Sequence, residues 1–153
     1  MKLQYKRLHG EDAHAAGLAL LEALYGGPLP EIRRTPLGKP YFVDSPLHFS
    51  VSHTPKHVFA ALSETPIGID AEELDRDIRL ALAEKILSAG EMAQFQKAED
   101  KRLALLKFWV LKEAAGKCTG QGLRIYPNHT DFSLDDPRIQ MLDGCLVAVI
   151  EDA

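Results

Sequence analysis

Apolar and polar residues alternate with a period of two along several short segments, which predicts β-strands. LHFSVSH at residues 47–53 places three apolar side chains on one face and polar side chains on the other. HVFAALS at residues 57–63 is a second short apolar run after a Thr-Pro break, and PIGIDAEE at residues 66–73 follows a further turn. The first two segments predict a pair of antiparallel strands, and the third predicts a further strand.

Helical spacing of apolar residues dominates four other segments. The first starts with acidic residues and ends at Gly-Gly-Pro, and the last ends near Gly120 and Gly122. The predicted helices cover residues 11–25, 78–87, 91–98 and 100–118.

Two regions show weaker signals. Residues 28–46 are rich in proline, turn residues and basic side chains, which predicts an irregular basic loop. Near the end of the sequence, DFSL at residues 131–134 and CLVAVIED at residues 145–152 predict two more strands, with a turn region at 135–144 between them.

The order of these elements predicts an α+β fold. A helix and two strands are followed by a strand, helices and two strands, which suggests two similar halves, about residues 1–65 and 66–153, within a single domain 1–153. The halves share no repeat of residue identity, so this prediction rests on element order alone.

Composition narrows the class of protein. The 153 residues are 46% hydrophobic and 26% charged, and 18 basic against 22 acidic side chains give a net charge of -4, which disfavours nucleic-acid binding. No segment has the length of a transmembrane helix or the apolar core of a signal peptide, so we expect a cytoplasmic protein without a membrane partner. Cys118 and Cys145 lack metal-ligand spacing, which predicts reduced structural thiols.

The segment GIDAE carries a candidate metal site. Alternation along a strand places Asp70 and Glu72 on one face, and paired carboxylates suit Mg²⁺, which prefers oxygen ligands. The alternative is that these acids simply end a strand and favour the positive end of the next helix. Taken alone, the alternative is the better interpretation.

The segment FWVLKEAAGK poses the same choice. Trp109, Glu113 and Lys117 are spaced by four and share one stripe of a helix, whereas Lys112 is turned about 100° from Glu113. Glu113 and Lys117 could form an ordinary ion pair worth about 0.2–0.5 kcal/mol. In combination with the GIDAE carboxylates, however, Glu113 becomes a third metal ligand and Lys117 a phosphate contact.

Three residues outside these motifs are weaker candidates. Ser52 and His53 end the strand LHFSVSH just before the chain turns at Pro55, where either side chain could reach a cleft. Lys39 follows Gly38 in the basic loop and could hold a phosphate, although a loop lysine is more often only solvated.

In this order, GKPYF, FSVSHT, GIDAE and FWVLKEAAGK resemble the motif series of the 4′-phosphopantetheinyl transferases. The most diagnostic pair of that family is GxDxE followed by W-x-x-K-E-x-x-x-K, and the later GQGL is similar to the family's GxGL. The motifs span Gly38 to Lys117. Their order resembles the surfactin-synthetase-activating type, in which two similar halves form a pseudodimer with one site between them, and this chain is a short example.

The resemblance implies an activity and a set of site residues. The expected reaction moves phosphopantetheine from coenzyme A to a serine of an apo acyl or peptidyl carrier protein, with Mg²⁺ as cofactor and adenosine 3′,5′-bisphosphate as product. The implied carrier protein is acidic, and the pseudodimer implies a monomer. The implied catalytic residues are Glu113, Asp70 and Lys117; the metal ligands are Asp70, Glu72 and Glu113; the coenzyme A contacts are Lys39, Ser52, His53, Lys112, Lys117, Arg33 and Arg34, with Lys6 and Arg7 as further basic residues early in the chain.

Several alternatives stay open at this point. The base that deprotonates the carrier serine is either Glu113 or a metal-held water. The chain could be a non-catalytic shortened relative that binds a carrier protein or coenzyme A, or an unrelated α+β interaction protein whose charged motifs only decorate its surface. The identity of the carrier protein and the use of acyl-coenzyme A do not follow from the sequence.

Overall fold

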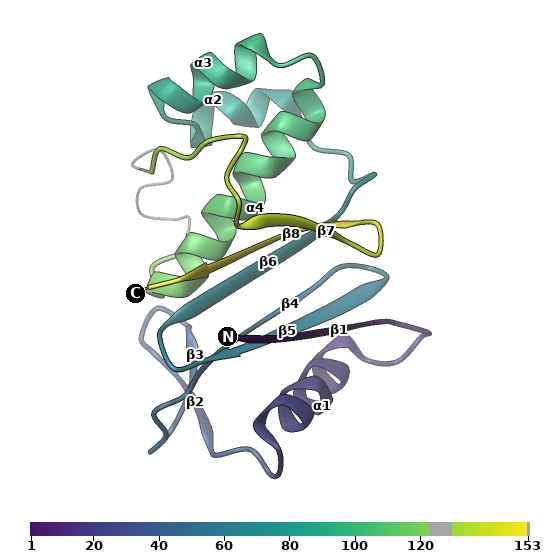
Figure 1. Ribbon diagram of the computed structural model, residues 1–153, viewed down its shortest axis with the longest axis vertical. Coiled ribbons are helices and arrows are strands. Elements are labelled where there is room, and N and C mark those ends of the chain that lie inside the picture. Colours follow the sequence, from purple (N-terminus) through teal and green to yellow (C-terminus); the bar gives the residue numbers. More distant parts are fainter. Residues whose placement is uncertain (123–129, 153) are drawn as a thin grey trace.

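The computed structural model describes residues 1–122 and 130–152. It contains two three-stranded antiparallel sheets, each covered by helices on its outer face, and a short two-stranded hairpin (Figure 1). The mixed α+β class predicted from the sequence is therefore confirmed. The strands are β1 (Lys2–Arg7), β2 (Ile32–Arg34), β3 (Pro40–Phe42), β4 (His48–His53), β5 (His57–Ser63), β6 (Ile67–Glu73), β7 (Ile139–Leu142) and β8 (Cys145–Glu151).

The two sheets have the same strand order. The first runs β1-β5-β4 and the second runs β6-β8-β7. In each sheet, the strand that comes last along the chain lies in the centre, between the other two. All pairings within both sheets are antiparallel.

The first sheet is covered by α1 (Ala13–Tyr25). Asp12 caps the start of this helix by accepting a hydrogen bond from the Ala15 N–H, and Gly26 ends it in the left-handed conformation, where glycine is favoured because it lacks a Cβ. Leu21 of the helix packs against Phe49 and neighbouring apolar residues of the sheet.

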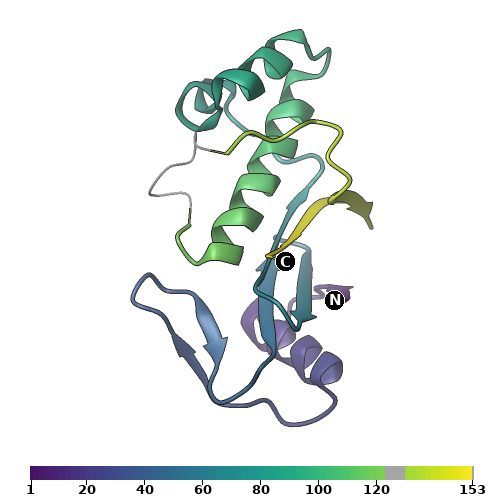
Figure 2. The same cartoon turned by 60° about the vertical axis from the view of Figure 1, so that its left-hand side comes forward.

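The second sheet is covered by the long helix α4 (Lys101–Thr119). Asp100 caps its start and Gly120 ends it, again in the left-handed conformation. Leu111 and eight other residues of α4 are buried, and the helix packs on β6 and β8. The short elements η1 (Leu80–Leu82), α2 (Ala83–Ile86) and α3 (Ala89–Lys97) extend this layer (Figure 2).

The two sheets meet where β4 lies beside β6. The hydroxyl oxygens of Ser50 and Ser52 accept hydrogen bonds of 3.1 Å from the backbone N–H groups of Ile69 and Ala71. Side chains of β4 thus satisfy backbone donors of β6 that no strand partner reaches on this side. A buried apolar cluster that includes Phe59 of β5 closes the same junction.

The strands predicted at 47–53, 57–63 and 66–73 are confirmed, and the predicted helices are present with shifted ends. The helical segment 78–87 is a 3₁₀ turn followed by α2, and α3 begins at Ala89 because Ser88 caps it. None of the helices in the described part of the chain is long and apolar enough to cross a membrane.

Three predictions about the remaining segments were wrong. The loop 28–46 contains the β2–β3 hairpin, in which both strands are only three residues long and give almost no periodic signal. Residues 131–134 form no strand, and β7 lies inside the predicted turn region 135–144. The sequence also gave no indication of β1, because five of its six residues are exposed and it carries polar side chains on both faces.

Candidate active site

The close approach of α4 to β6 depends on Gly68. A Cβ at this position would lie 1.9 Å from the Ala114 carbonyl oxygen and 2.5 Å from the Cys118 backbone nitrogen. Both contacts are to helix backbone, which cannot move aside as a flexible side chain can. The glycine of GIDAE therefore lets the helix lie directly on the strand, and this brings Glu113 and Lys117 next to Asp70.

Asp70 is the buried centre of the site. The residue is only 7% exposed, and its Oδ1 atom lies 3.3 Å from Lys117 Nζ and 3.4 Å from the Ser52 hydroxyl, which donates to it. Lys117 also donates to the Ile69 carbonyl oxygen at 3.0 Å and to that of Val51 at 3.4 Å. The lysine thus joins α4 to both sheets.

Glu72 is held from two sides. Trp109 Nε1 donates to its Oε1 atom at 3.2 Å, and Arg76 donates to the same oxygen at 2.5 Å. The Arg76 guanidinium also lies 5.2 Å from the centre of the Trp109 ring. The tryptophan of the α4 motif therefore orients a carboxylate as well as packing the helix.

The electrostatics of the site favour a cation. Burial, together with the nearby carboxylates of Glu72 and Glu113, raises the pKa of Asp70 to about 7 even though Lys117 opposes the shift. Burial also raises the pKa of Glu113, and Lys117 again opposes this. Asp70 Oδ2 is buried without a hydrogen-bond partner. Such an acceptor is costly to leave unpaired, and a bound cation would pair it.

The donor set fits Mg²⁺. Asp70, Glu72 and Glu113 supply only carboxylate oxygens, which hard divalent cations prefer. These oxygens do not all lie within 4.8 Å of one another; among the described residues, only His57, Glu73 and Cys145 form a group of three that does. The three carboxylates are thus arranged more openly than a closed site, as suits an ion that also binds waters and a substrate phosphate.

Two cavities meet at this site. One, of about 460 Å³, is lined by Ser52, Asp70, Glu72 and Trp109 among others. The other, of about 470 Å³, extends between α1, the β2–β3 hairpin and the end of α4. Residues common to both linings are Val51, His53, Glu113 and Lys117.

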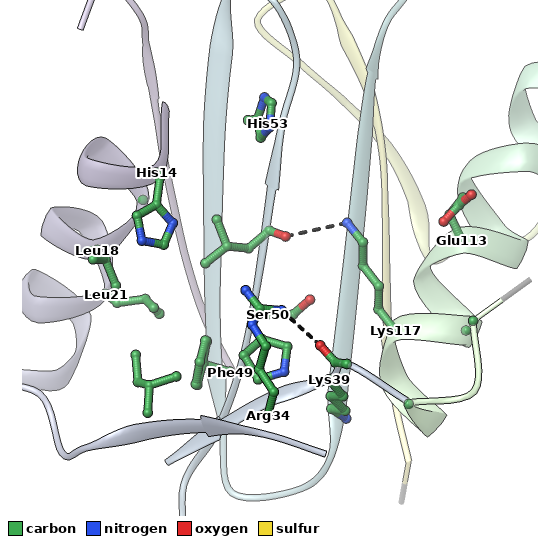
Figure 3. Close-up of a pocket in the computed structure, with 18 of the residues that line it drawn as sticks. His14, Leu18, Leu21, Arg34, Lys39, Phe49, Ser50, His53, Glu113 and Lys117 are labelled. Carbon is green, nitrogen blue, oxygen red and sulfur yellow. Dashed lines mark hydrogen bonds between the residues drawn. The ribbon is translucent and has the colours of Figure 1, made fainter. Parts of the chain in front are cut away.

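The second cavity is basic at one end and apolar in its middle. Figure 3 shows His14 and Leu18 of α1 facing Glu113 and Lys117 of α4 across it, with Arg34 and Lys39 nearby. Arg34 donates to the Gly38 carbonyl at 2.9 Å, and Lys39 donates to that of Cys118 at 2.5 Å. Burial lowers the pKa of Lys39. The cavity thus offers cationic groups for phosphates and an apolar surface between them.

The structure places most of the predicted site residues around these two cavities. Asp70, Glu72, Ser52, His53, Glu113, Lys117, Lys39 and Arg34 all line one or both.

Two predicted coenzyme A contacts lie elsewhere. Lys112 is buried on another face of α4, where its ammonium lies 2.7 Å from Glu91 Oε1 and 2.7 Å from the Thr130 hydroxyl. It lines neither cavity, because the turn of about 100° per residue separates it from Glu113, so its contact with coenzyme A stays a prediction that these cavities do not support. Neighbouring side chains of a strand point to opposite faces, so Arg33 points away from Arg34. It pairs with Glu31 at the surface.

Two further basic residues, Lys6 and Arg7, line neither cavity, whereas His14, which was not predicted, lines one of them. Lys6 pairs with Glu11, and Arg7 forms a bidentate pair with Asp143. His14, the second residue of α1, lines the second cavity, and no sequence pattern singled it out because a lone histidine near a helix start belongs to no motif. The motif residue Leu123 lies outside the described residues.

Comparison with known proteins agrees with this geometry. The profile of the 4′-phosphopantetheinyl transferase superfamily matches residues 66–143, about half of the chain. The chain is 35% identical over 110 residues to the 4′-phosphopantetheinyl transferase gsp of Aneurinibacillus migulanus, which covers 71% of this chain and 45% of that protein.

Two further relatives give similar values. Identity is 39% over 89 residues with psf-1 of Bacillus pumilus, covering 56% of this chain and 38% of that protein. Identity is 33% over 129 residues with Sfp of Bacillus subtilis strain 168, and the match covers 76% of this chain and 57% of that protein. The chain spans about half the length of these curated relatives. From the profile match and the shared motifs it follows that the chain belongs to the 4′-phosphopantetheinyl transferase superfamily.

Proposed function

We propose that this protein transfers 4′-phosphopantetheine from coenzyme A to a serine hydroxyl of an apo acyl or peptidyl carrier protein, releasing adenosine 3′,5′-bisphosphate. The observation that carries the proposal is the junction of the two cavities at Glu113 and Lys117, beside the buried Asp70. The cavity beside the hairpin is large and basic enough to take part of coenzyme A. The other cavity exposes the carboxylates to the second substrate, the carrier protein.

Asp70, Glu72 and Glu113 would hold Mg²⁺ in this proposal. When bound, the ion neutralises charge on the pyrophosphate, where negative charge is spread over both the transferred and the leaving group. The unpaired Asp70 Oδ2 atom supports this role, because a cation would satisfy it.

The protein's own side chains would then bind and align the substrates. Lys117, fixed by two backbone carbonyls and Asp70, presents its charge at the mouth shared by both cavities and contacts the pyrophosphate. His53 lines both cavities and contacts the same phosphates. Arg34 and Lys39 lie toward the hairpin and bind the nucleotide end.

Glu113 is the proposed general base. It lines both cavities, so it can face a serine hydroxyl and the phosphate at the same time. Burial raises its pKa above that of an ordinary glutamate, which makes the carboxylate a stronger proton acceptor. We assign the serine proton to Glu113 rather than to a metal-held water on these two grounds.

We further propose that residues 1–65 and 66–153 are two similar halves of one domain, arranged as a pseudodimer. The common strand order of the two sheets supports this, as does the position of the site between β4 of one and β6 of the other. A protein that contains both halves in one chain would act as a monomer. Its basic cavity would attract the acidic surface of a carrier protein.

Intact-mass analysis tests the transferase. An apo acyl carrier protein is incubated with coenzyme A, Mg²⁺ and wild-type protein, Glu113→Gln or, as a matched control, Glu84→Gln on the exposed side of α2. We expect the carrier to gain the mass of one phosphopantetheine with wild type and with Glu84→Gln. Glu113→Gln should give none.

The short chain makes one other outcome informative. Because the chain spans 38–57% of the three relatives described above, a non-catalytic relative that only binds coenzyme A is the second candidate. Coenzyme A binding without any mass gain across several carrier proteins would favour it and would refute the transferase.

A further inference from the structure

A second group of potential metal ligands lies on the other face of β6 from the carboxylate site. Because side chains alternate along a strand, Glu73 points away from its neighbour Glu72. It faces His57, which starts β5, and Cys145, which starts β8 and pairs directly with Glu73 in the sheet. His57 is 3% exposed and Cys145 is fully buried. The β4–β5 and β7–β8 turns lie at this end of the molecule (Figure 1).

Three polar groups converge on a single oxygen atom there. Glu73 Oε2 lies 2.8 Å from His57 Nδ1 and 3.1 Å from Cys145 Sγ, and it also accepts a hydrogen bond from the Thr54 hydroxyl. His57 Nδ1 and Cys145 Sγ are themselves 3.3 Å apart. A nitrogen, an oxygen and a sulfur ligand atom therefore form a compact triangle inside the protein.

We propose that His57 Nδ1, Glu73 Oε2 and Cys145 Sγ bind a Zn²⁺ ion. Tetrahedral zinc with bond lengths of about 2.0–2.3 Å places its ligand atoms about 3.3–3.6 Å apart, so the triangle needs to open by only about half an ångström. The mixed nitrogen, oxygen and sulfur set suits zinc. It does not suit Mg²⁺, which takes oxygen ligands.

The surroundings of His57 match those of a metal-bound imidazole. Its Nε2 atom lies 2.8 Å from Asp143 Oδ2, and Asp143 is held in turn by two hydrogen bonds from Arg7, at 2.7 and 2.9 Å. A carboxylate on the outer nitrogen fixes the ring and the tautomer, so that Nδ1 points at the ion.

The charges also balance. With His57 protonated and Cys145 as a thiol, the charges of His57, Glu73, Asp143 and Arg7 sum to zero. Zinc would replace two protons, one from the imidazolium and one from the thiol, and the sum would again be zero. Binding therefore buries no additional net charge.

The ion would connect the two sheets. His57 belongs to the first sheet, whereas Glu73 and Cys145 belong to the second. Zinc would fix their junction directly behind Glu72, on the opposite face of the strand that carries the carboxylate site. This site is independent of the proposed transferase activity.

Cobalt substitution tests the site directly. The full-length protein is stripped with a chelator and titrated with Co²⁺, which reports a tetrahedral thiolate site through a near-ultraviolet charge-transfer band and intense visible bands. We expect both to saturate at one equivalent and to disappear on addition of Zn²⁺. Absence of the charge-transfer band from folded wild-type protein would overturn the proposal.

Matched variants locate the ion. Cys145→Ser should lose the charge-transfer band, whereas Cys118→Ser, which alters the other buried cysteine, should keep it. Asp143→Asn should weaken zinc affinity by about 10–100-fold through the loss of its contact with the imidazole. Asp70→Asn should keep the charge-transfer band, because it alters only the carboxylate site. A band that survives Cys145→Ser, or that is lost in Asp70→Asn, would place the metal elsewhere and refute the assignment.

Discussion

Asp70 should make the folded protein less stable as the pH rises, and Asp70→Asn should remove this effect. The carboxyl is buried, and its pKa rises from 3.8 to about 7 on folding. One pKa unit corresponds to about 1.4 kcal/mol, so the ionised side chain is disfavoured in the folded protein by about 4 kcal/mol as an upper limit. Asparagine has nearly the same shape and carries no charge.

The direction of the pH dependence follows from proton linkage. Below pH 3.8 the carboxyl is protonated in both the folded and the unfolded state, so burying it costs no ionisation free energy. Between pH 3.8 and about 7 the folded state binds more protons than the unfolded chain, so stability falls as the pH rises. Lys117 keeps its two backbone carbonyl partners in the variant, which limits the loss on that side.

Urea unfolding at pH 4 and pH 8 in the absence of divalent cations measures this directly. The stability of Asp70→Asn relative to wild type should be higher at pH 8 than at pH 4, by up to about 4 kcal/mol. Asp75→Asn serves as the control, because it makes the same chemical change at an exposed position close by. Mg²⁺ should stabilise wild type at pH 8 and should not stabilise Asp70→Asn.

Two results would refute the reasoning. An equal difference between variant and wild type at both pH values would mean that the buried carboxyl is not disfavoured in its ionised form. Equal stabilisation of both proteins by Mg²⁺ would mean that Asp70 does not contribute to the metal site.

Three further predictions follow from other contacts. Gly68→Ala should lower the free energy of unfolding by about 3 kcal/mol or more, because the new Cβ meets helix backbone; a loss below about 1 kcal/mol in urea unfolding would contradict the close approach. Lys112→Met should cost about 3–5 kcal/mol by leaving the buried Glu91 carboxylate without its counter-ion, and adding Glu91→Gln, which removes the charge but keeps an acceptor oxygen for the backbone N–H groups of Ser88 or Phe132, should recover part of this loss; if the double variant is as unstable as the single one, the ion pair is not the cause. Arg34→Ala should raise the KM for coenzyme A in the carrier-labelling assay and Arg33→Ala should not, and the reverse order would exclude Arg34 from the proposed nucleotide end.

The core elements could be predicted from the sequence because their signals are local. Strands 47–53, 57–63 and 66–73 alternate or form short apolar runs, and α1 and α4 carry caps and glycine stops at their ends. The failures are also local in origin. β7 and the two strands of the β2–β3 hairpin are only three or four residues long, too short for an alternation of apolar and polar residues to stand out.

By itself, the sequence determined which side chains share a face of one element: Asp70 with Glu72 on β6, and Glu113 with Lys117 on α4. Only the tertiary structure decided which faces meet. Gly68 lets α4 lie against β6, and the same packing buries Lys112, the neighbour of Glu113, against Glu91 instead of in a cavity. The convergence of His57, Glu73 and Cys145 was equally invisible, because the residues are separated by 16 and 72 positions and meet only where the two sheets join. Periodicity is a property of neighbouring residues, whereas a site depends on contacts between elements that only the packed core defines.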